Sequence, residues 1–170
     1  MENKPESFEE KAKEYFDEKK YRTIIVGRDG YKSNEDLEDA IAALIEDKIS
    51  TEEKEEILKH LKASKAKQAL FKAIQSSKSD AKKAKLIAAC WEIDLDCTDD
   101  FLFFVDLTCN EDFNVSLEAL TVIENIENAI PVNQLEQAQK QVTARIKERP
   151  DNIDLLVDLL QIIKDRSEAN

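Results

Sequence analysis

The scarcity of glycine is the feature that most limits what this chain can fold into. The 170 residues contain two glycines, Gly27 and Gly30, where average usage of roughly 7% would give about 12. Glycine supplies the positive φ of tight hairpin turns and lets the backbone approach a phosphate closely. After residue 30 the sequence therefore excludes a glycine-rich phosphate-binding loop and disfavours a hairpin-rich sandwich or barrel. An all-helical fold is what remains.

Length and composition indicate a soluble, ordered domain. A chain of 170 residues buries roughly 70% of the surface that it exposes when unfolded, so it needs no disulfide bonds. The longest apolar run, Leu86–Trp91, is far short of the ~20 residues that span a bilayer, and the first residues lack the apolar segment of a secretory signal. Three cysteines cannot all pair within one chain. We therefore expect a reducing, cytoplasmic location and no membrane partner.

Hydrophobic periodicity and helix start signals predict eight helices after residue 32. The best start signal is Ser50-Thr51-Glu52-Glu53, a capping box in which the first and last residues each cap the other's backbone N–H. The helix over 80–92 is apolar nearly all round, which indicates that it is covered on more than one side. The expected helices cover 33–48, 51–62, 64–76, 80–92, a segment holding Phe101–Leu107, 113–128, a segment that starts at Pro131, and one that starts at Pro150 and frays near Ser167.

The apolar run Phe101–Leu107 could by itself be a buried strand. An acidic start signal favours a helix, because Thr98 can serve as the N-cap. Asp99 and Asp100 then fall in the first turn, where the helix macrodipole favours negative charge.

Residues 1–32 are expected to form a separate N-terminal region. Apolar residues at helical spacing predict a helix over 6–20, and the branched run Tyr21–Val26 predicts a short extended segment. A turn at Gly27–Gly30 follows. The sequence therefore predicts a domain boundary between this region and a helical-repeat domain over 33–170.

Two loop-and-helix units resemble each other at an offset of 33 residues. Phe71–Ile74 precedes the first loop and Phe104–Leu107 precedes the second, and a period in the 30s is typical of stacked helical hairpins. Asp112–Leu120, which opens a helix after a short loop, resembles the entry to the second helix of HEAT-like (armadillo-type) repeats. Ser79–Ala84 is a weaker copy.

The resemblance covers about residues 50–130 and departs from the family at Val115 and Ser116, where many HEAT repeats carry an arginine. It implies an all-α fold of antiparallel helical hairpins stacked as a short α-solenoid, with an irregular helical bundle as the alternative. Such stacks present extended surfaces that bind other protein chains.

Charge is distributed in blocks along the chain. The net charge is −12, yet residues 63–85 contain seven basic residues and one acidic residue, and residues 86–129 contain eleven acidic residues and no basic residue. Charged faces keep a protein soluble, but this acidic block also favours docking of a basic or amphipathic partner segment. Nucleic acid is not expected as a partner, because its phosphates are bound by lysine and arginine.

The acidic loop Asp94–Asp100 has oxygen ligands at alternating positions, as a calcium-binding loop has. It departs from that pattern at its sixth position, Asp99 instead of glycine, and at its twelfth, Val105 instead of glutamate. We interpret it as a connection between helices. No catalytic motif, cofactor or metal site is predicted.

Neither the histidine nor the cysteines have metal-ligand spacing. His60 is the only histidine and is expected on the polar side of its helix. Cys90 and Cys109 fall in apolar surroundings and are predicted to lie in the core. Cys97, in the acidic loop, is predicted to be the most reactive of the three thiols.

These observations predict a non-catalytic protein-interaction module whose acidic surface docks a basic or amphipathic segment of another protein. Two alternatives stay open. One is a metal-dependent regulator or enzyme that uses the acidic loop, and the other is an oligomeric structural helical domain. The residues expected to contact the partner are Asp94, Asp96, Asp99, Asp100, Glu111 and Asp112.

Overall fold

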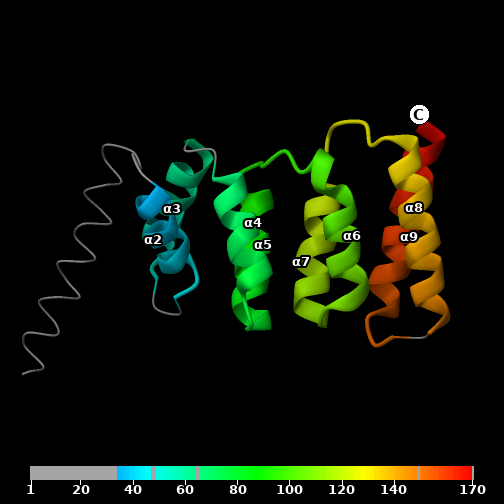
Figure 1. The fold of residues 1–170 in the computed structure, drawn as a ribbon, viewed down its shortest axis with the longest axis horizontal. Helices are drawn as coiled ribbons and strands as arrows, with labels where there is room; N and C mark the ends of the chain where they lie inside the picture. Colours follow the sequence, from blue (N-terminus) through cyan, green and yellow to red (C-terminus); the bar gives the residue numbers. More distant parts are fainter. Residues whose placement is uncertain (1–33, 47–48, 64–65, 149, 170) are drawn as a thin grey trace, which may run out of the picture. The chain divides into compact units, whose positions relative to one another are not determined.

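The computed structural model describes residues 34–46, 49–63, 66–148 and 150–169, and these form eight α-helices and one 3-10 helix with no strand. The all-α class and the number of helices expected after residue 32 are confirmed (Figure 1). The predicted helix over 6–20, extended segment and glycine turn lie outside the described residues. The elements are α2 (Asn34–Leu44), α3 (Thr51–Ala63), α4 (Lys67–Ser76), α5 (Asp80–Glu92), η1 (Thr98–Asp100), α6 (Phe101–Asn110), α7 (Phe113–Glu124), α8 (Val132–Lys147) and α9 (Ile153–Ala169).

The chain divides into two compact units, residues 1–66 and 67–170. In the first unit α2 packs against α3. The predicted capping box at the start of α3 is confirmed, because Glu53 N donates to Ser50 Oγ at 3.2 Å and Ser50 N donates to Glu53 Oε2 at 3.0 Å. The expected boundary between residues 32 and 33 stays a prediction.

In the second unit the helices pack in pairs. α4 packs with α5, α6 with α7, and α8 with α9 (Figure 1). Successive pairs are also in contact, since α7 packs against both α5 and α9, and α6 packs against α8. Phe71 of α4 lies against two rings of α6, Phe103 at 5.2 Å and Phe104 at 5.6 Å between ring centroids. The core of this unit therefore runs through all three pairs.

Two predictions about apolar runs are confirmed by burial. Helix α5 is covered by α4 and by α7, as its apolar circumference indicated. The Phe101–Leu107 run is helical, and Phe101 and Phe104 are fully buried. A helix of this kind can bury apolar residues on several sides because α6 touches α7, α8 and α9 at once.

Several helix ends differ from the predicted ones. Helix α2 ends at Leu44 instead of 48, α4 begins at Lys67 instead of 64, and α7 ends at Glu124 instead of 128. At the end of α7, Asn125 donates from both its backbone N and its side-chain Nδ2 to the Thr121 carbonyl. The side chain thus bonds back to the last turn of the helix, a local bond to the backbone that asparagine often makes.

The two predicted proline starts are each displaced. Pro131 occupies the N-cap of α8 instead of its first turn, and its carbonyl accepts from Gln134 N and Leu135 N. Helix α9 begins at Ile153, three residues after Pro150, and continues to Ala169 instead of fraying near Ser167. None of the helices in the described ranges is long and apolar enough to cross a bilayer.

Asn152 joins the last helical pair to the one before it. Its side chain is buried, and Nδ2 donates to the Thr108 carbonyl at 2.8 Å and to Ser116 Oγ at 3.0 Å. Thr108 lies in the last turn of α6 and Ser116 lies in the first turn of α7. One amide therefore satisfies buried polar groups on two helices.

Replacing Asn152 by alanine is expected to lower the free energy of unfolding by about 1–3 kcal/mol, because it leaves a buried carbonyl without its donor. Urea unfolding followed by the fluorescence of Trp91, which lies in the same unit, measures this change. Asn133→Ala, at an exposed position of α8, is the matched control and is expected to cost less than about 0.5 kcal/mol. Equal losses for the two variants would contradict the linking role.

Candidate interaction surface

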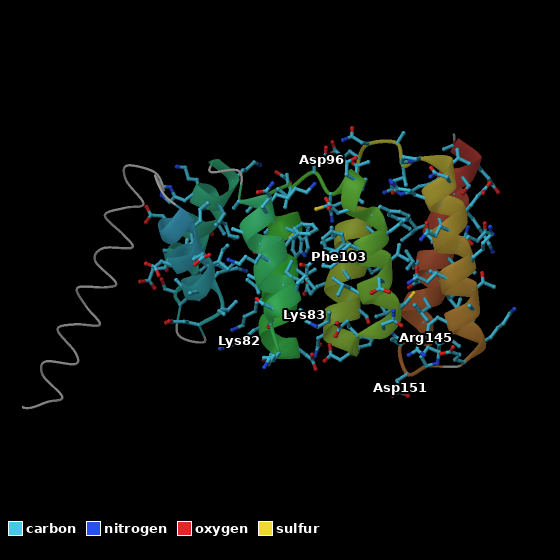
Figure 2. All side chains as sticks on the ribbon, viewed as in Figure 1. Lys82, Lys83, Asp96, Phe103, Arg145 and Asp151 are labelled. Atoms are coloured by element: carbon cyan, nitrogen blue, oxygen red, sulfur yellow. The ribbon has the colours of Figure 1, made fainter. Side chains whose placement is uncertain are left out.

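The connection between α5 and α6 gathers four of the six predicted contact residues: Asp94, Asp96, Asp99 and Asp100. The first three are exposed and Asp100 is half-buried. Figure 2 shows Asp96 at this end of α6. The acidic loop is therefore largely a surface feature, but three of its four aspartates, Asp94, Asp96 and Asp100, also have structural roles.

Asp94 turns the chain at the end of α5. Its φ of 52° is in the left-handed region, where glycine is the usual residue after a helix. The turn is closed by two backbone bonds, Asp94 N to Trp91 O at 3.1 Å and Leu95 N to Cys90 O at 2.9 Å. Aspartate tolerates this conformation better than branched residues do, so the helix ends without a glycine.

Asp96 organises the start of the 3-10 helix. Its Oδ1 accepts from Thr98 Oγ1 at 2.6 Å and from Thr98 N at 3.0 Å, and its Oδ2 accepts from Asn128 Nδ2 at 3.2 Å. The bonds from the Thr98 hydroxyl and backbone hold the pKa of Asp96 below its usual range. The carboxylate therefore connects the α5–α6 connection to the segment that follows α7.

Lys67, the first residue of α4, holds the same connection from the other side. Its Nζ donates to the Asp96 carbonyl at 2.8 Å and pairs with Asp100 Oδ2 at 2.5 Å. Burial alone would lower the pKa of Lys67, but the hydrogen bond and charge of Asp100, together with Asp96, raise it above the usual lysine value. Two of the predicted contact carboxylates are thus committed to bonds within the fold.

The predicted capping role of Thr98 is wrong. Thr98 is the first residue of η1, and α6 begins only at Phe101, with Asp100 at its N-cap and no capping bond from that side chain. The Thr98 hydroxyl donates to Asp96 instead of accepting from the next turn. The sequence signal that was missed is the Asp-x-Thr spacing, in which a carboxylate bonds to the backbone two residues on.

Cys97 lies in the core and not on the surface of the acidic loop, and its rank as the most reactive of the three thiols stays a prediction. All three cysteines are free and buried, with Cys97 only 1% exposed. A hydrogen bond between the sulfurs of Cys90 and Cys97, together with burial, raises the pKa of Cys90 well above its usual range. Burial, with the nearby charge of Asp106, raises the pKa of Cys109 to about 11. The predicted core positions of Cys90 and Cys109 are confirmed.

The other two predicted residues lie at the α6–α7 connection. Asp112 is the N-cap of α7 and accepts from Val115 N at 2.9 Å. Glu111 Oε1 pairs with Lys83 of α5 at 2.8 Å. These are also bonds within the fold. The first caps α7, and the second ties α5 to the residue just before that cap.

The six predicted residues therefore form two groups, one at each end of α6. A helix of 10 residues is about 15 Å long, so the two groups do not form one site. In Figure 2, Asp96 lies at one end of α6, and Arg145, which donates to the carbonyl of Cys109 near the other end, lies far from it. Contact of either group with a partner stays a prediction.

An exposed apolar surface lies on α7. Leu117 is 40% exposed and Phe113 is 55% exposed, and we call these two residues the α7 apolar pair. The 3.6-residue period of the α-helix predicts the exposure of Leu117, because this residue lies about 160° around the helix from the fully buried Val115 and Ala119. These residues are the functional candidates that the charge pattern alone did not find.

No family model, curated protein or solved structure matches this chain. Within the part of the chain that the structure describes, no three His, Cys, Asp or Glu side chains are grouped so that they could hold a metal ion. His60 is half-buried in α3.

Substitution of Asp94 tests the glycine-free turn. Asp94→Val is expected to lower the free energy of unfolding by about 1–3 kcal/mol, because a branched residue is strained at positive φ. Asp94→Gly is expected to preserve or raise stability. Urea unfolding followed by circular dichroism compares the two, with Asp99→Val in the neighbouring 3-10 helix as the control. Equal stability of the valine and glycine variants at position 94 would contradict the strain.

Thiol accessibility tests the burial of the cysteines. In the folded protein at pH 8, Cys90, Cys97 and Cys109 are expected to react with a disulfide reagent much more slowly than in denaturant. The raised pKa values of Cys90 and Cys109 keep these thiols protonated, and the thiolate is the reactive form. An Asp99→Cys variant supplies an exposed thiol as the control. Fast reaction of Cys97 in the folded wild type would contradict its burial.

Proposed function

We propose that this chain is a non-catalytic protein-interaction module whose acidic surface docks a basic or amphipathic segment of another protein. The observation that supports this most is the charge of residues 86–129, which contain eleven carboxylates and no lysine or arginine. This stretch includes α6, α7 and their connections. A surface with this excess of carboxylates attracts a basic segment, increases its association rate and selects against acidic competitors.

The arrangement that best fits this function is a short α-solenoid of the HEAT-like type. Contacts between successive pairs support it, because α5, α7 and α9 are neighbours in sequence order and α6 and α8 are also neighbours. The N-caps of α5 and α7, Ser79 and Asp112, are 33 residues apart, as the sequence offset predicted. Each side chain accepts from the backbone N–H three residues on.

The carboxylates that dock the partner are those that the fold does not use. Asp96, Asp100, Glu111 and Asp112 stabilise connections between helices. Other acidic residues of the same stretch, among them Asp99, Glu124 and Glu127, are exposed. We therefore place the electrostatic contribution on this second set, which overlaps the original candidates at Asp99.

A second candidate function is an oligomeric structural domain. The observation that favours it is the exposure of Val132 on α8 and Val157 on α9, which are 57% and 51% exposed. Large exposed apolar side chains are often covered by another chain. The mass in solution, measured by light scattering over a range of concentrations, separates a monomeric module from an oligomer.

The interaction module predicts a strong dependence of binding on salt. Proteins captured from a lysate by the immobilised chain are expected to carry basic segments. The affinity of each purified partner for the chain is expected to fall when the salt concentration rises from about 0.1 M to about 1 M, because the Debye length falls from about 10 Å to about 3 Å. A partner with the same affinity at both salt concentrations would contradict the charge mechanism. Failure to capture any specific protein at low salt would contradict the module.

Two variants locate the charge. Asp99→Asn, Glu124→Gln and Glu127→Gln together remove three exposed carboxylates of the acidic stretch. This triple variant is expected to bind the captured partner with lower affinity than the wild type does. Glu52→Gln, Glu55→Gln and Glu56→Gln remove three exposed carboxylates of α3 and serve as the control with equal net charge. Equal weakening by both variants would show that only the total charge of the chain matters.

A further inference from the structure

The α7 apolar pair is exposed on a helix whose other large apolar residues are mostly buried. Val115, Leu120, Val122 and Ile123 are at most 4% exposed, whereas Phe113 and Leu117 are 55% and 40% exposed. Residues four apart on a helix lie on one face, with about 5–6 Å between their Cβ atoms. The two side chains therefore form one continuous apolar surface.

Two hydrogen bonds establish which way this face points. On one side of α7, Glu118 Oε2 accepts from Trp91 Nε1 of α5 at 2.9 Å. On the other side, Ser116 Oγ accepts from Asn152 Nδ2, just before α9, at 3.0 Å. With 3.6 residues per turn, the apolar pair lies in the arc between these two contacts. Phe113 and Leu117 are exposed there, whereas Leu120, seven residues after Phe113 on the same face, is buried. The exposed apolar surface is therefore confined to the N-terminal part of α7.

The charges around the apolar pair are acidic on α7 and on the adjacent part of α9. Glu124, seven residues after Leu117, is exposed on the same face of α7. Helix α9, which packs beside α7, exposes Asp154 and Asp158 one turn apart. Helix α5, on the opposite side, carries the exposed Lys82. Exposed carboxylates therefore lie on α7 itself and on the neighbouring α9.

We propose that this face of α7 docks a basic amphipathic helix of a partner protein, with Phe113 and Leu117 contacting its apolar side and Glu124, Asp154 and Asp158 attracting its lysines or arginines. The proposal rests on the proposed function and names its site and partner class. An amphipathic helix offers apolar residues at a spacing of three and four, which matches the i, i+4 spacing of the pair. A second copy of this chain fits the face poorly, because each copy carries a net charge of −12 and like charges repel.

Fluorescence anisotropy with the full chain and designed peptides tests the proposal. The probe is a labelled peptide of about 15 residues, with leucines at amphipathic spacing and lysines elsewhere. A peptide of the same composition, scrambled to remove the apolar face, is its control. The amphipathic peptide is expected to bind more tightly, and binding is expected to weaken with salt. Equal binding of the two peptides would overturn the apolar contact while leaving the acidic module in place.

The double variant Phe113→Ser/Leu117→Ser is expected to weaken the amphipathic peptide at least about tenfold, as loss of a central apolar contact does. Val132→Ser, at an equally exposed valine, is the matched control and is expected to leave affinity unchanged. Thermal melts followed by circular dichroism check that each variant is folded. Salt-dependent binding that both variants leave unchanged would overturn the docking face but not the proposed function.

Two further outcomes show whether the chain binds basic segments at all and whether a second copy of the chain covers this face. If neither basic peptide binds at low salt, both the docking face and the proposed function are overturned. If the wild-type chain forms a dimer in light scattering and the double variant does not, a second copy occupies this face and the proposed partner class is overturned.

Discussion

The polar groups at helix ends, in a chain almost without glycine, are the constraint on which this structure depends. Every helix leaves backbone N–H groups at its start and carbonyls at its end without partners, and glycine is the common means of closing the second set. Here polar side chains replace it. Asp94 takes the left-handed position after α5, and the Asn125 amide bonds to a carbonyl at the end of α7. At the helix starts, Asp112 caps α7.

The same interactions also hold successive helical pairs together. Arg145 of α8 donates to the Cys109 carbonyl near the end of α6 at 2.8 Å. Arg166 of α9 donates to the carbonyls of Ile123 and Ile126, at the end of α7, at 3.0 and 2.8 Å. Carbonyls at and just after the ends of α6 and α7 thus accept from donors of the next pair. Capping and packing cannot be separated here, since removing a neighbouring pair would expose or orphan these carbonyls.

Local patterns in the sequence were sufficient to predict the helices but not the tertiary contacts. The Ser50–Glu53 capping box and helix 80–92 depend on residues close in sequence, and both are confirmed. The burial of Cys97 depends on α5, and the Asn128 and Lys67 bonds to Asp96 come from residues about 30 positions away. No local signal contains that information. The six acidic candidates were chosen by charge alone, which does not show whether a carboxylate faces a partner or a lysine of the same fold.

That distinction changes how the acidic stretch is understood. A carboxylate that caps a helix or pairs with Lys67 or Lys83 has its charge partly neutralised by nearby donors, so it offers less to an external partner. Glu124 is exposed on α7, and Asp154 and Asp158 are exposed on α9, the helix that packs against α7. Phe113 and Leu117 are the exposed large apolar residues of α7. Near a low-dielectric surface an ion pair is stronger than in bulk water. On the proposed function, the acidic residues that we expect to matter most for recognition are therefore those nearest Phe113 and Leu117, where apolar contact and charge would act on the same partner.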